Sequence, residues 1–352
     1  MTKFAYVGWQ VGVNYQAEGS GIDWPYLKNV IDRSADAGMN FISLMMVSYG
    51  YFCPEHDGYA WPVANPRLRP LRDRNCLNVN LESEFVSRAL DYAKKRGFHC
   101  QLMMNGMIWN PARVASSYPQ AASQRHSDGR KEIDGWLFCP DSPGGFQLAV
   151  DEIRDLLAFY ADSPVDSFAF ERLGYNAGTC YCAYSREQFR RDTGQDLDAS
   201  SLSHSIWKGN AARGHLKRYV DAIKQVRPGI GVWAHSGGAP EWGHYPHVLR
   251  DIGIAAVSNH GQHFLTTKQA FHQQLDWLDP LPCIPHLCVR DKPTQNYRVP
   301  LRGPEMIREH AEWLADYPGD RVQGAVFFNE VRTTERNKAV VYDIAQDWAV
   351  MN

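Results

Sequence analysis

The sequence predicts an α/β protein folded as a single (β/α)₈ TIM barrel, with residues 1–352 forming one catalytic domain. Short apolar runs alternate with longer segments of helical period, and this alternation occurs eight times along the chain. No linker-like stretch separates two halves. The first strand ends Gly-Trp-Gln-Val-Gly, without a glycine-rich phosphate loop, which favours the barrel over a doubly wound open sheet.

The predicted strands are apolar runs of strand length, bounded by turn residues. In order they are Phe4–Val13, Phe41–Val47, Phe98–Ile108, Asp166–Phe170, Gly229–Ala234, Ile254–Asn259, Cys283–Val289 and Val322–Phe328. The predicted helices are Pro25–Ala37, Leu81–Lys95, Phe146–Tyr160, Arg186–Thr193, Ile206–Gln225, Pro240–Ile252, Thr266–Leu278, Pro304–Ala315 and Arg336–Ala349. Long loops follow strand two, over Tyr49–Asn78, and strand three, ending near Gly145. We expect these two loops to wall the C-terminal face of the barrel.

Composition narrows the class of protein. The chain is 44% hydrophobic and 22% charged, with a formal net charge of −2, as in ordinary globular proteins. This balance gives no sign of nucleic-acid or membrane binding, since either would normally show a basic excess. The N-terminus reads directly into a strand, so we expect a cytoplasmic protein whose eight cysteines are reduced. We expect no cofactor, and a homo-oligomer is a reasonable assumption.

The candidate site follows from the strand ends, because barrel enzymes carry their chemistry at the C-terminal face. Two carboxylates follow strongly apolar strands: Glu171 comes after Phe-Ala-Phe, and Glu330 after Val-Phe-Phe-Asn. A strand that buries Phe and then presents Glu holds the acid on rigid backbone, which suits a catalytic group. The alternative for each is a buried ion pair with Arg172, Arg290 or Arg332.

Polar and aromatic residues stand at most of the other strand ends. We predict a carbohydrate-binding cleft, because aromatic rings stack on sugar rings while Asn, His, Asp and Arg hydrogen-bond the hydroxyl groups. The candidate substrate-binding residues are Trp9, Tyr49, Asn105, Trp109, Asp141, His235, Trp242, His260, Arg290 and Asp291. Trp61, in the loop after strand two, is a further aromatic candidate on this face.

Two carboxyl groups across an aromatic cleft are what glycoside hydrolysis requires. One carboxylate stays ionised and the other stays protonated to release the leaving sugar. Arg172 would keep Glu171 ionised, whereas the apolar approach to Glu330 favours its protonated form. Glu171 is therefore the predicted nucleophile and Glu330 the predicted general acid/base. The partner, carbohydrate, is either a small glycoside or an oligosaccharide.

Residues 138–197 resemble barrel-type glycosyl hydrolases, including β-galactosidase-type enzymes. The resemblance lies in Phe138-Cys139-Pro140-Asp141-Ser142-Pro143, which is similar to their Cys-Pro-Asn-Ser-Pro loop, and in the run from Cys180 to Phe189, which is similar to their Cys-x-Cys-x-x-Cys run. It implies a barrel hydrolase with an acid after strand four. The third Cys of the run is Ser185 here, so we do not expect a metal at this cluster. Relatives also place Asn-Glu after strand four rather than strand eight, which makes Asp291 another possible second acid.

Two other functions fit the strand ends. A metal-dependent sugar isomerase or epimerase would gather Glu171, His235, His260 and Glu330 around a divalent ion. A non-catalytic carbohydrate-binding barrel would bind sugar without turnover. Metal analysis and mutation of Glu171 would separate these alternatives from a glycoside hydrolase.

Overall fold

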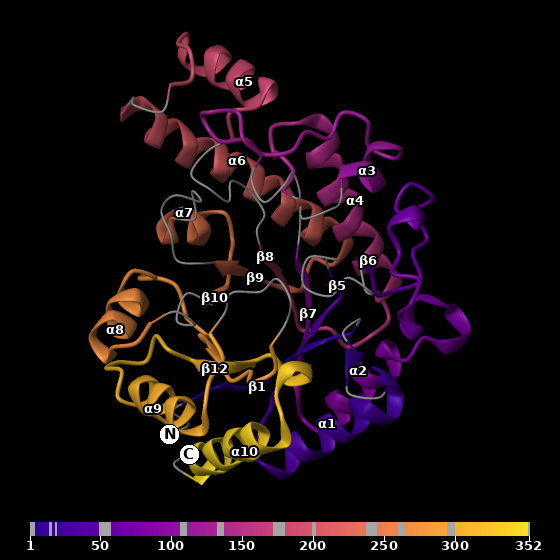
Figure 1. Ribbon diagram of the computed structural model, residues 1–352, viewed down its shortest axis with the longest axis vertical. Helices are drawn as coiled ribbons and strands as arrows, with labels where there is room; N and C mark the ends of the chain where they lie inside the picture. The colour runs from indigo at the N-terminus through magenta and orange to yellow at the C-terminus, as the bar shows by residue number, and fades with distance from the viewer. Residues whose placement is uncertain are drawn as a thin grey trace.

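The computed structural model describes residues 4–13, 16–17, 20–48, 58–105, 111–131, 137–171, 180–198, 202–236, 245–259, 265–293 and 300–350. Its centre is a parallel sheet of eight strands, in the order β10-β9-β8-β7-β4-β1-β12-β11. The sheet closes between β10 and the residues just before β11, where Val257 N–H donates to the Pro282 carbonyl and the Val257 carbonyl accepts from Ile284 N–H. The predicted barrel is therefore confirmed, with the helices arranged around its rim (Figure 1).

All eight predicted barrel strands are present, each shorter than or equal to its predicted run. They are β1 (Tyr6–Gly12), β4 (Phe41–Met45), β7 (His99–Asn105), β8 (Ser167–Glu171), β9 (Gly231–Ser236), β10 (Ala256–Asn259), β11 (His286–Cys288) and β12 (Gly324–Phe328). Two small antiparallel pairs were not predicted: β2 (Gln16–Ala17) with β3 (Ser20–Gly21), and β5 (Val47–Ser48) with β6 (Gly58–Tyr59).

The helices follow the predicted order. They are α1 (Trp24–Asp36), α2 (Val86–Lys95), α3 (Pro111–Ala115), α4 (Pro143–Phe159), α5 (Ala183–Thr193), α6 (Leu202–Val226), α7 (Pro246–Asp251), α8 (Lys268–Asp276), α9 (Pro304–Ala315) and α10 (Glu335–Val350). The short α3 lies in a segment predicted as loop, and residues 81–85 precede α2 instead of belonging to it. Short 3₁₀ turns occupy Arg69–Leu71, Leu77–Val79, Leu81–Ser83 and Glu330–Arg332.

Caps explain several helix starts. The Asp23 carboxylate accepts from the Tyr26 backbone N–H and begins α1, with Pro25 in its first turn. Ser142 begins α4 in the same way, by accepting from Gly145 N–H. Thr267 caps α8 through Ala270 N–H. These caps fix where each strand-to-helix loop ends, and hence how much chain is left to build the C-terminal face.

Side chains inside the barrel form layers, because successive strand residues alternate between the two faces. One layer is a cluster of buried residues from six strands and the residues just before β11: Phe41, Met103, Ala169, Trp233, Ala256, Ile284 and Val326. Within this layer, the rings of Phe41 and Trp233 stack at a centroid distance of 5.5 Å. The barrel interior is therefore a packed core rather than a channel.

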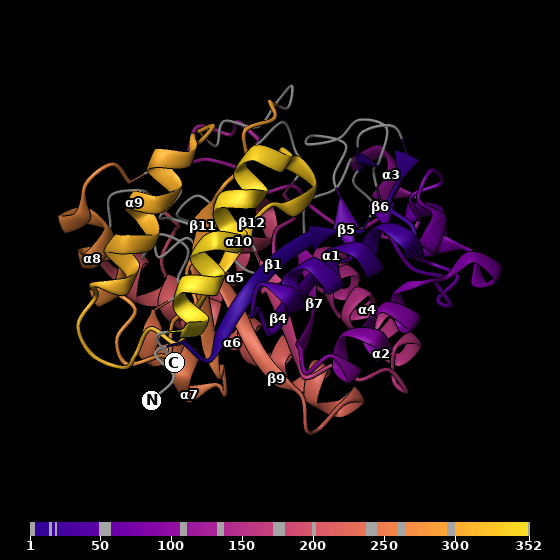
Figure 2. The same cartoon turned by 90° about the horizontal axis from the view of Figure 1, so that it is seen from below.

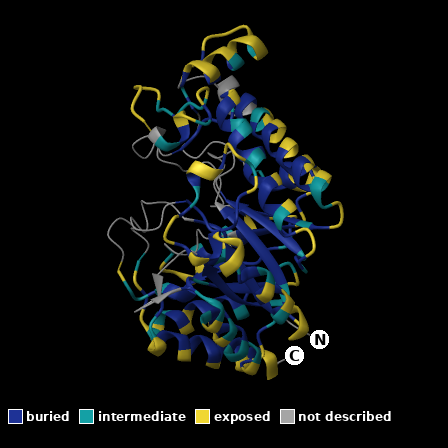
Figure 3. Cartoon of the chain, turned by 90° about the vertical axis from the view of Figure 1, so that its right-hand side faces the viewer, coloured by how far each residue is buried: buried dark blue, intermediate teal, exposed yellow. Residues whose placement is uncertain are grey.

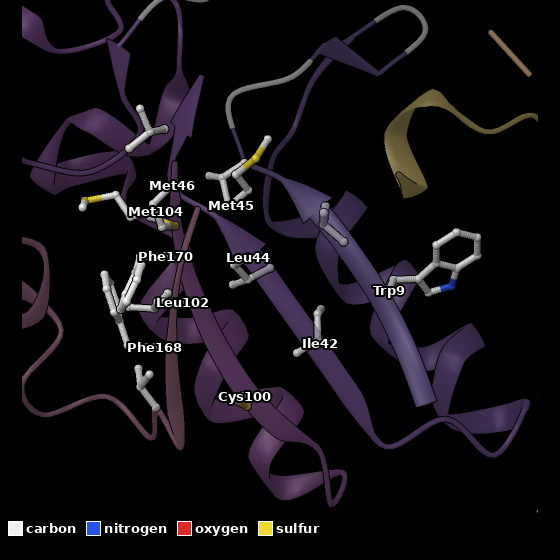
Figure 4. Close-up of a cluster of buried hydrophobic side chains, with 14 of the residues drawn as sticks. Trp9, Ile42, Leu44, Met45, Met46, Cys100, Leu102, Met104, Phe168 and Phe170 are labelled. Carbon is white, nitrogen blue, oxygen red and sulfur yellow. The ribbon is translucent and has the colours of Figure 1, made fainter. Parts of the chain in front are cut away.

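The outward-facing side chains pack against the helices in a larger cluster. Ile42, Leu44, Leu102 and Phe168 belong to it (Figure 4). The burial pattern repeats this arrangement, with buried strands and helices exposed along their outer sides (Figure 3). The helix α10 runs along the outside of the barrel beside β1, and the two chain ends lie near each other (Figure 2).

Candidate active site

The candidate site is the layer of lumen side chains nearest the C-terminal ends of the strands. Glu171, His235 and Ser258 each stand two residues beyond a member of the buried lumen layer, so they point to the same side. The strand register places these three residues directly beside one another on β8, β9 and β10. His286 and Phe328 occupy the same level on β11 and β12.

Glu171 lies beside one imidazole of this layer, which in turn contacts a second. Its Oε2 atom is 4.0 Å from Nδ1 of His235. The rings of His235 and His286 have centroids 4.1 Å apart, so the imidazoles are in contact. Glu171 is 7% exposed, compared with 3% for His235 and 1% for His286. The carboxylate is therefore the most accessible of the three groups and lies where the packed core ends.

His286 was missed from the sequence. Its signal was a single His in an apolar strand, which more often marks a packed residue than a functional one. The position two residues after Ile284, a lumen residue, could have identified it once strand alternation was applied to every predicted strand. Among the described residues of this layer, Glu171 is the one carboxylate.

Glu330 has a different environment. It begins the 3₁₀ turn after β12 and is 1% exposed. Its Oε1 pairs with the ammonium group of Lys338, and its Oε2 accepts a 2.6 Å hydrogen bond from the Tyr26 hydroxyl. Lys338 is on α10 and Tyr26 is on α1, so both partners come from the helical shell. The buried ion pair considered as the alternative for Glu330 is thus present, with Lys338 in place of an arginine.

Asp291 and Arg290 are also engaged in the strand-end loops. Asp291 accepts hydrogen bonds from the backbone N–H and the hydroxyl of Thr334, immediately before α10. Asp291 therefore holds the residue that directly precedes α10. Arg290 is buried, and its guanidinium group donates to the Lys292 carbonyl at 2.9 Å. These contacts join the loop after β11 to the start of α10.

Trp9 does not reach the site. It alternates with Gln10, whose amide lies against Met45 and Met103 in the lumen, so the indole faces outward. The ring of Trp9 is 5.7 Å from that of Phe327 and 6.0 Å from that of Tyr342 on α10. Figure 4 shows the indole pointing away from the other strands. Its predicted role in substrate binding is replaced by packing between β1 and α10.

Trp61 is likewise a packing residue, because it is fully buried and its Nε1 donates to Asp155 on α4 at 2.8 Å. Several other predictions lie outside the described residues: Tyr49, Trp109, Trp242, His260 and Arg172. The register places Asn105 on β7 opposite Glu171, and its side chain is outside the described part of the chain.

Asp141 joins a second buried cluster instead of the Glu171 layer. Its carboxylate accepts from the Ser185 hydroxyl and lies 2.7 Å from Nε2 of His215. The thiols of Cys139, Cys180 and Cys182 adjoin it, with sulfur atoms within 4.8 Å of one another. Within the described residues, this is the one group of His, Cys, Asp or Glu side chains close enough to hold a metal ion. The chemistry of the three sulfurs suits a thiolate-binding ion such as zinc.

The seven described cysteines are all buried free thiols. Burial raises the pKa of Cys283 to about 12 and that of Cys100 to about 12, so both behave as apolar core residues. Across the described helices, none combines the length and apolar character needed to cross a bilayer.

Comparison with known proteins supports the fold class. No protein-family model matches the chain, and no curated protein matches it. Solved structures of glycoside hydrolase barrels do match it. The PgaB (BpsB) glycoside hydrolase domain from Bordetella bronchiseptica is 13% identical, with a TM-score of 0.68 over 96% of this chain and 98% of that domain.

Two longer enzymes are similar in the same way. A β-galactosidase from Bacillus circulans sp. alkalophilus is 13% identical, with a TM-score of 0.67 over 98% of this chain and 56% of its own. A β-N-acetylhexosaminidase is 12% identical, with a TM-score of 0.64 over 98% of this chain and 72% of its own. The chain thus has the barrel fold found in these glycoside hydrolases, and it spans little more than half of the β-galactosidase.

Proposed function

We propose that this protein is a glycoside hydrolase in which Glu171 is a catalytic carboxylate. The observation that carries the proposal is its position at the C-terminal end of β8, on the lumen side, next to His235. Barrel enzymes act at this face. The similar solved structures, which carry glycoside hydrolase names, support the same class of reaction.

His235 and His286 complete the proposed site. Each imidazole offers one donor and one acceptor, so the pair suits hydroxyl groups of a bound sugar. Because Glu171 is held on a strand and packed beside a ring, its carboxylate keeps one orientation when substrate binds. Of the residues that the sequence predicts for the site, Glu171 and His235 are therefore the two that we retain at its centre.

The structure makes Glu330 a weaker candidate for the second catalytic carboxylate. Glycoside hydrolysis normally uses a pair of Asp or Glu residues, although substrates with an acetamido group supply their own nucleophile in some families. Glu330 remains a candidate partner from the sequence, but its ion pair with Lys338 favours a structural role. We therefore include N-acetylhexosaminides beside galactosides among the substrates to test, since a single acid suffices for them. Similar solved structures bear both enzyme names, β-galactosidase and β-N-acetylhexosaminidase.

The test is a panel of chromogenic galactosides and N-acetylhexosaminides assayed with wild type, Glu171→Gln and Glu330→Gln. We expect Glu171→Gln to lower kcat/KM by ~10²–10⁴-fold, the usual contribution of a positioned acid or base. Thermal unfolding of each variant separates loss of chemistry from loss of fold. Wild-type turnover by folded Glu171→Gln on an accepted glycoside would refute the proposal. Sugar binding without turnover in the wild type would instead identify a non-catalytic barrel.

A further inference from the structure

A hollow of about 1000 Å³ lies outside the proposed active site. Its walls are the loop after β6 and the C-terminal end of α4. Figure 1 shows this loop at the outer edge of the molecule, on the side of α4. The described residues that line the hollow do not include any member of the lumen layer around Glu171. The hollow is therefore a separate feature, and its volume is that of pockets that bind small organic molecules.

More than half of the described lining is apolar. The apolar side chains are those of Pro62, Val63, Ala64, Val79, Leu81 and Phe159. Leu81 is 75% exposed, and Leu77, on the preceding 3₁₀ turn, is 48% exposed. Large apolar side chains left in water at the edge of a hollow are typical of a binding site, because a ligand that covers them removes apolar surface from water.

Two arginines, Arg69 and Arg72, line the same hollow. Arg69 begins the 3₁₀ turn Arg69–Leu71, and Arg72 directly follows this turn. Side chains at positions i and i+3 of a 3₁₀ turn lie on the same side of it, so both guanidinium groups come from one wall. Arg72 is half-buried, whereas Arg69 is exposed and donates to the Ala64 carbonyl at 3.1 Å.

The charge of these arginines is not neutralised by the protein. Within the part of the chain that the structure describes, neither guanidinium has a carboxylate partner. Glu82, the one acid of the described lining, is exposed and also has no ion pair there. Two arginines and one glutamate leave this lining with one net positive charge. A single carboxylate balances that charge, and its two oxygens match the planar fork of a guanidinium.

Buried hydrogen bonds hold the first wall in place. The Asp155 carboxylate, on α4, accepts from the backbone N–H groups of Ala64 and Asn65 at 3.3 and 2.6 Å. It also accepts from Nε1 of Trp61 at 2.8 Å. Because Asp155 is only 8% exposed, these bonds are shielded from water, and they fix residues 61–65 against α4.

Asn78 fixes the second wall in the same way. Its amide nitrogen donates to the Ala60 carbonyl at 2.6 Å and to the Tyr160 hydroxyl at 3.0 Å. Its amide oxygen accepts from two backbone N–H groups at the start of α2. Residues 79–83 lie between these anchored points and complete the hollow with Phe159, the neighbour of Tyr160. A site with walls tied in this way is preformed, so a ligand pays little for ordering it.

We propose that this hollow binds a small amphipathic monocarboxylate, of the class of medium-chain fatty acids. The carboxylate pairs with Arg72, assisted by Arg69, and the chain covers Leu81 and the apolar wall. The body of the ligand is aliphatic and not a sugar, because the described lining holds one aromatic ring, Phe159, beside five aliphatic residues. Binding is non-covalent and goes beyond the proposed hydrolase reaction.

The first experiment compares three ligands on the wild-type protein by isothermal titration calorimetry. Octanoate has both the chain and the charge, 1-octanol has the chain alone, and acetate has the charge alone. We expect one octanoate site per chain and no saturable binding of acetate. Binding of 1-octanol should be at least ~10-fold weaker than that of octanoate, because the hydrogen bonds to a charged group are lost.

Three variants then test where octanoate binds. Arg72→Gln should weaken octanoate binding at least ~10-fold and leave 1-octanol binding unchanged. Leu81→Ser should weaken both ligands by a similar factor, because it removes apolar surface that either chain covers. Arg74→Gln changes an exposed arginine of the same loop that does not line the hollow, so this matched control should bind octanoate as the wild type does.

Several outcomes would overturn the proposal. They are a wild type that does not bind octanoate, 1-octanol or acetate binding as tightly as octanoate, and wild-type octanoate affinity in both Arg72→Gln and Leu81→Ser. Thermal unfolding checks that each variant is folded, and the comparison of ligands on the wild type needs no variant. Glycoside turnover should be the same in all three variants, so this proposal and the proposed hydrolase activity can fail separately.

Discussion

Two glutamates stand at or just after the ends of apolar strands in this barrel, and they contact different residues. Glu171 closes β8 inside the lumen and lies 4.0 Å from a histidine. Glu330 follows β12 and is enclosed by Tyr26 of α1 and Lys338 of α10. The first faces the region where substrates bind in barrels, and the second joins the last strand to two helices.

The difference shows that a carboxylate after a strand is not by itself a sign of catalysis. What separates the two is the number of residues between the acid and the last lumen residue. Glu171 is two residues beyond Ala169, so it stays on the lumen side, whereas Glu330 is four beyond Val326 and past the end of β12. Mutations should therefore affect activity at β8 and stability at β12.

The largest expected stability effect comes from Lys338→Met. It leaves the carboxylate of Glu330, 1% exposed, without its cation. Breaking a buried pair by removing one partner costs ~3–5 kcal/mol, so the free energy of unfolding in urea should fall by about that amount. The double variant Glu330→Gln with Lys338→Met should recover most of the loss. If Lys338→Met kept its stability but lost turnover, Glu330 would belong to the active site and would not be a structural residue.

His310, on α9 outside the barrel, should make the stability of the fold depend on pH. Burial lowers the pKa of this α9 histidine to about 4, so the folded protein keeps it neutral where the unfolded chain is protonated. The contribution is complete above pH ~6.5 and is lost as pH falls towards 4, by up to ~3 kcal/mol. The free energy of unfolding, measured in urea at several pH values between 4 and 6.5, should therefore depend less steeply on pH in His310→Gln than in the wild type.

The variant His310→Gln also tests whether the helices outside the barrel affect the activity at the strand ends. His310 packs on Phe271 and Trp313, away from the layer that holds Glu171. The pH profile of kcat/KM should therefore be unchanged in His310→Gln on any accepted glycoside. A shifted profile would show that the shell histidine is coupled to the active site.

The fold could be predicted largely from the sequence, because each barrel strand is a buried apolar run and each is followed by a helix. Glu171 could be identified because it directly continues such a run. The outward orientation of Trp9 could also have been predicted, because Trp9 alternates with Gln10 along the strand. The prediction that Trp9 binds substrate relied instead on the aromatic residues at the strand ends. The packing of Trp9 on Tyr342 joins positions more than 300 residues apart in sequence.

The partners of Glu330 could not be predicted. Tyr26 is 304 residues away, and Lys338 is one of many cations in the last helices. The run from Cys180 was recognised as a motif, but the contact of Asp141 with His215 could not be predicted from spacing. Asp141 lies just before α4 and His215 is on α6, so only the packing of these two helices brings them together.

The smallest expected effect is that of Tyr26→Phe. Its hydroxyl donates to Glu330 at 2.6 Å, and burial together with the charge of Glu330 raises the pKa of Tyr26, so it stays protonated. Hydrogen bonds to charged groups contribute ~1.5–3 kcal/mol, and half-burial of Tyr26 places the expected cost near the lower figure. In the Glu330→Gln background the cost should shrink, because the acceptor is then neutral; this coupling is measured by a double-mutant cycle. Turnover should stay at the wild-type rate throughout, since the pair lies in the shell. If Tyr26→Phe instead shifted the pH profile of kcat/KM while the cycle showed no coupling in stability, Glu330 would be a catalytic acid tuned by Tyr26, and the contrast between β8 and β12 would be wrong.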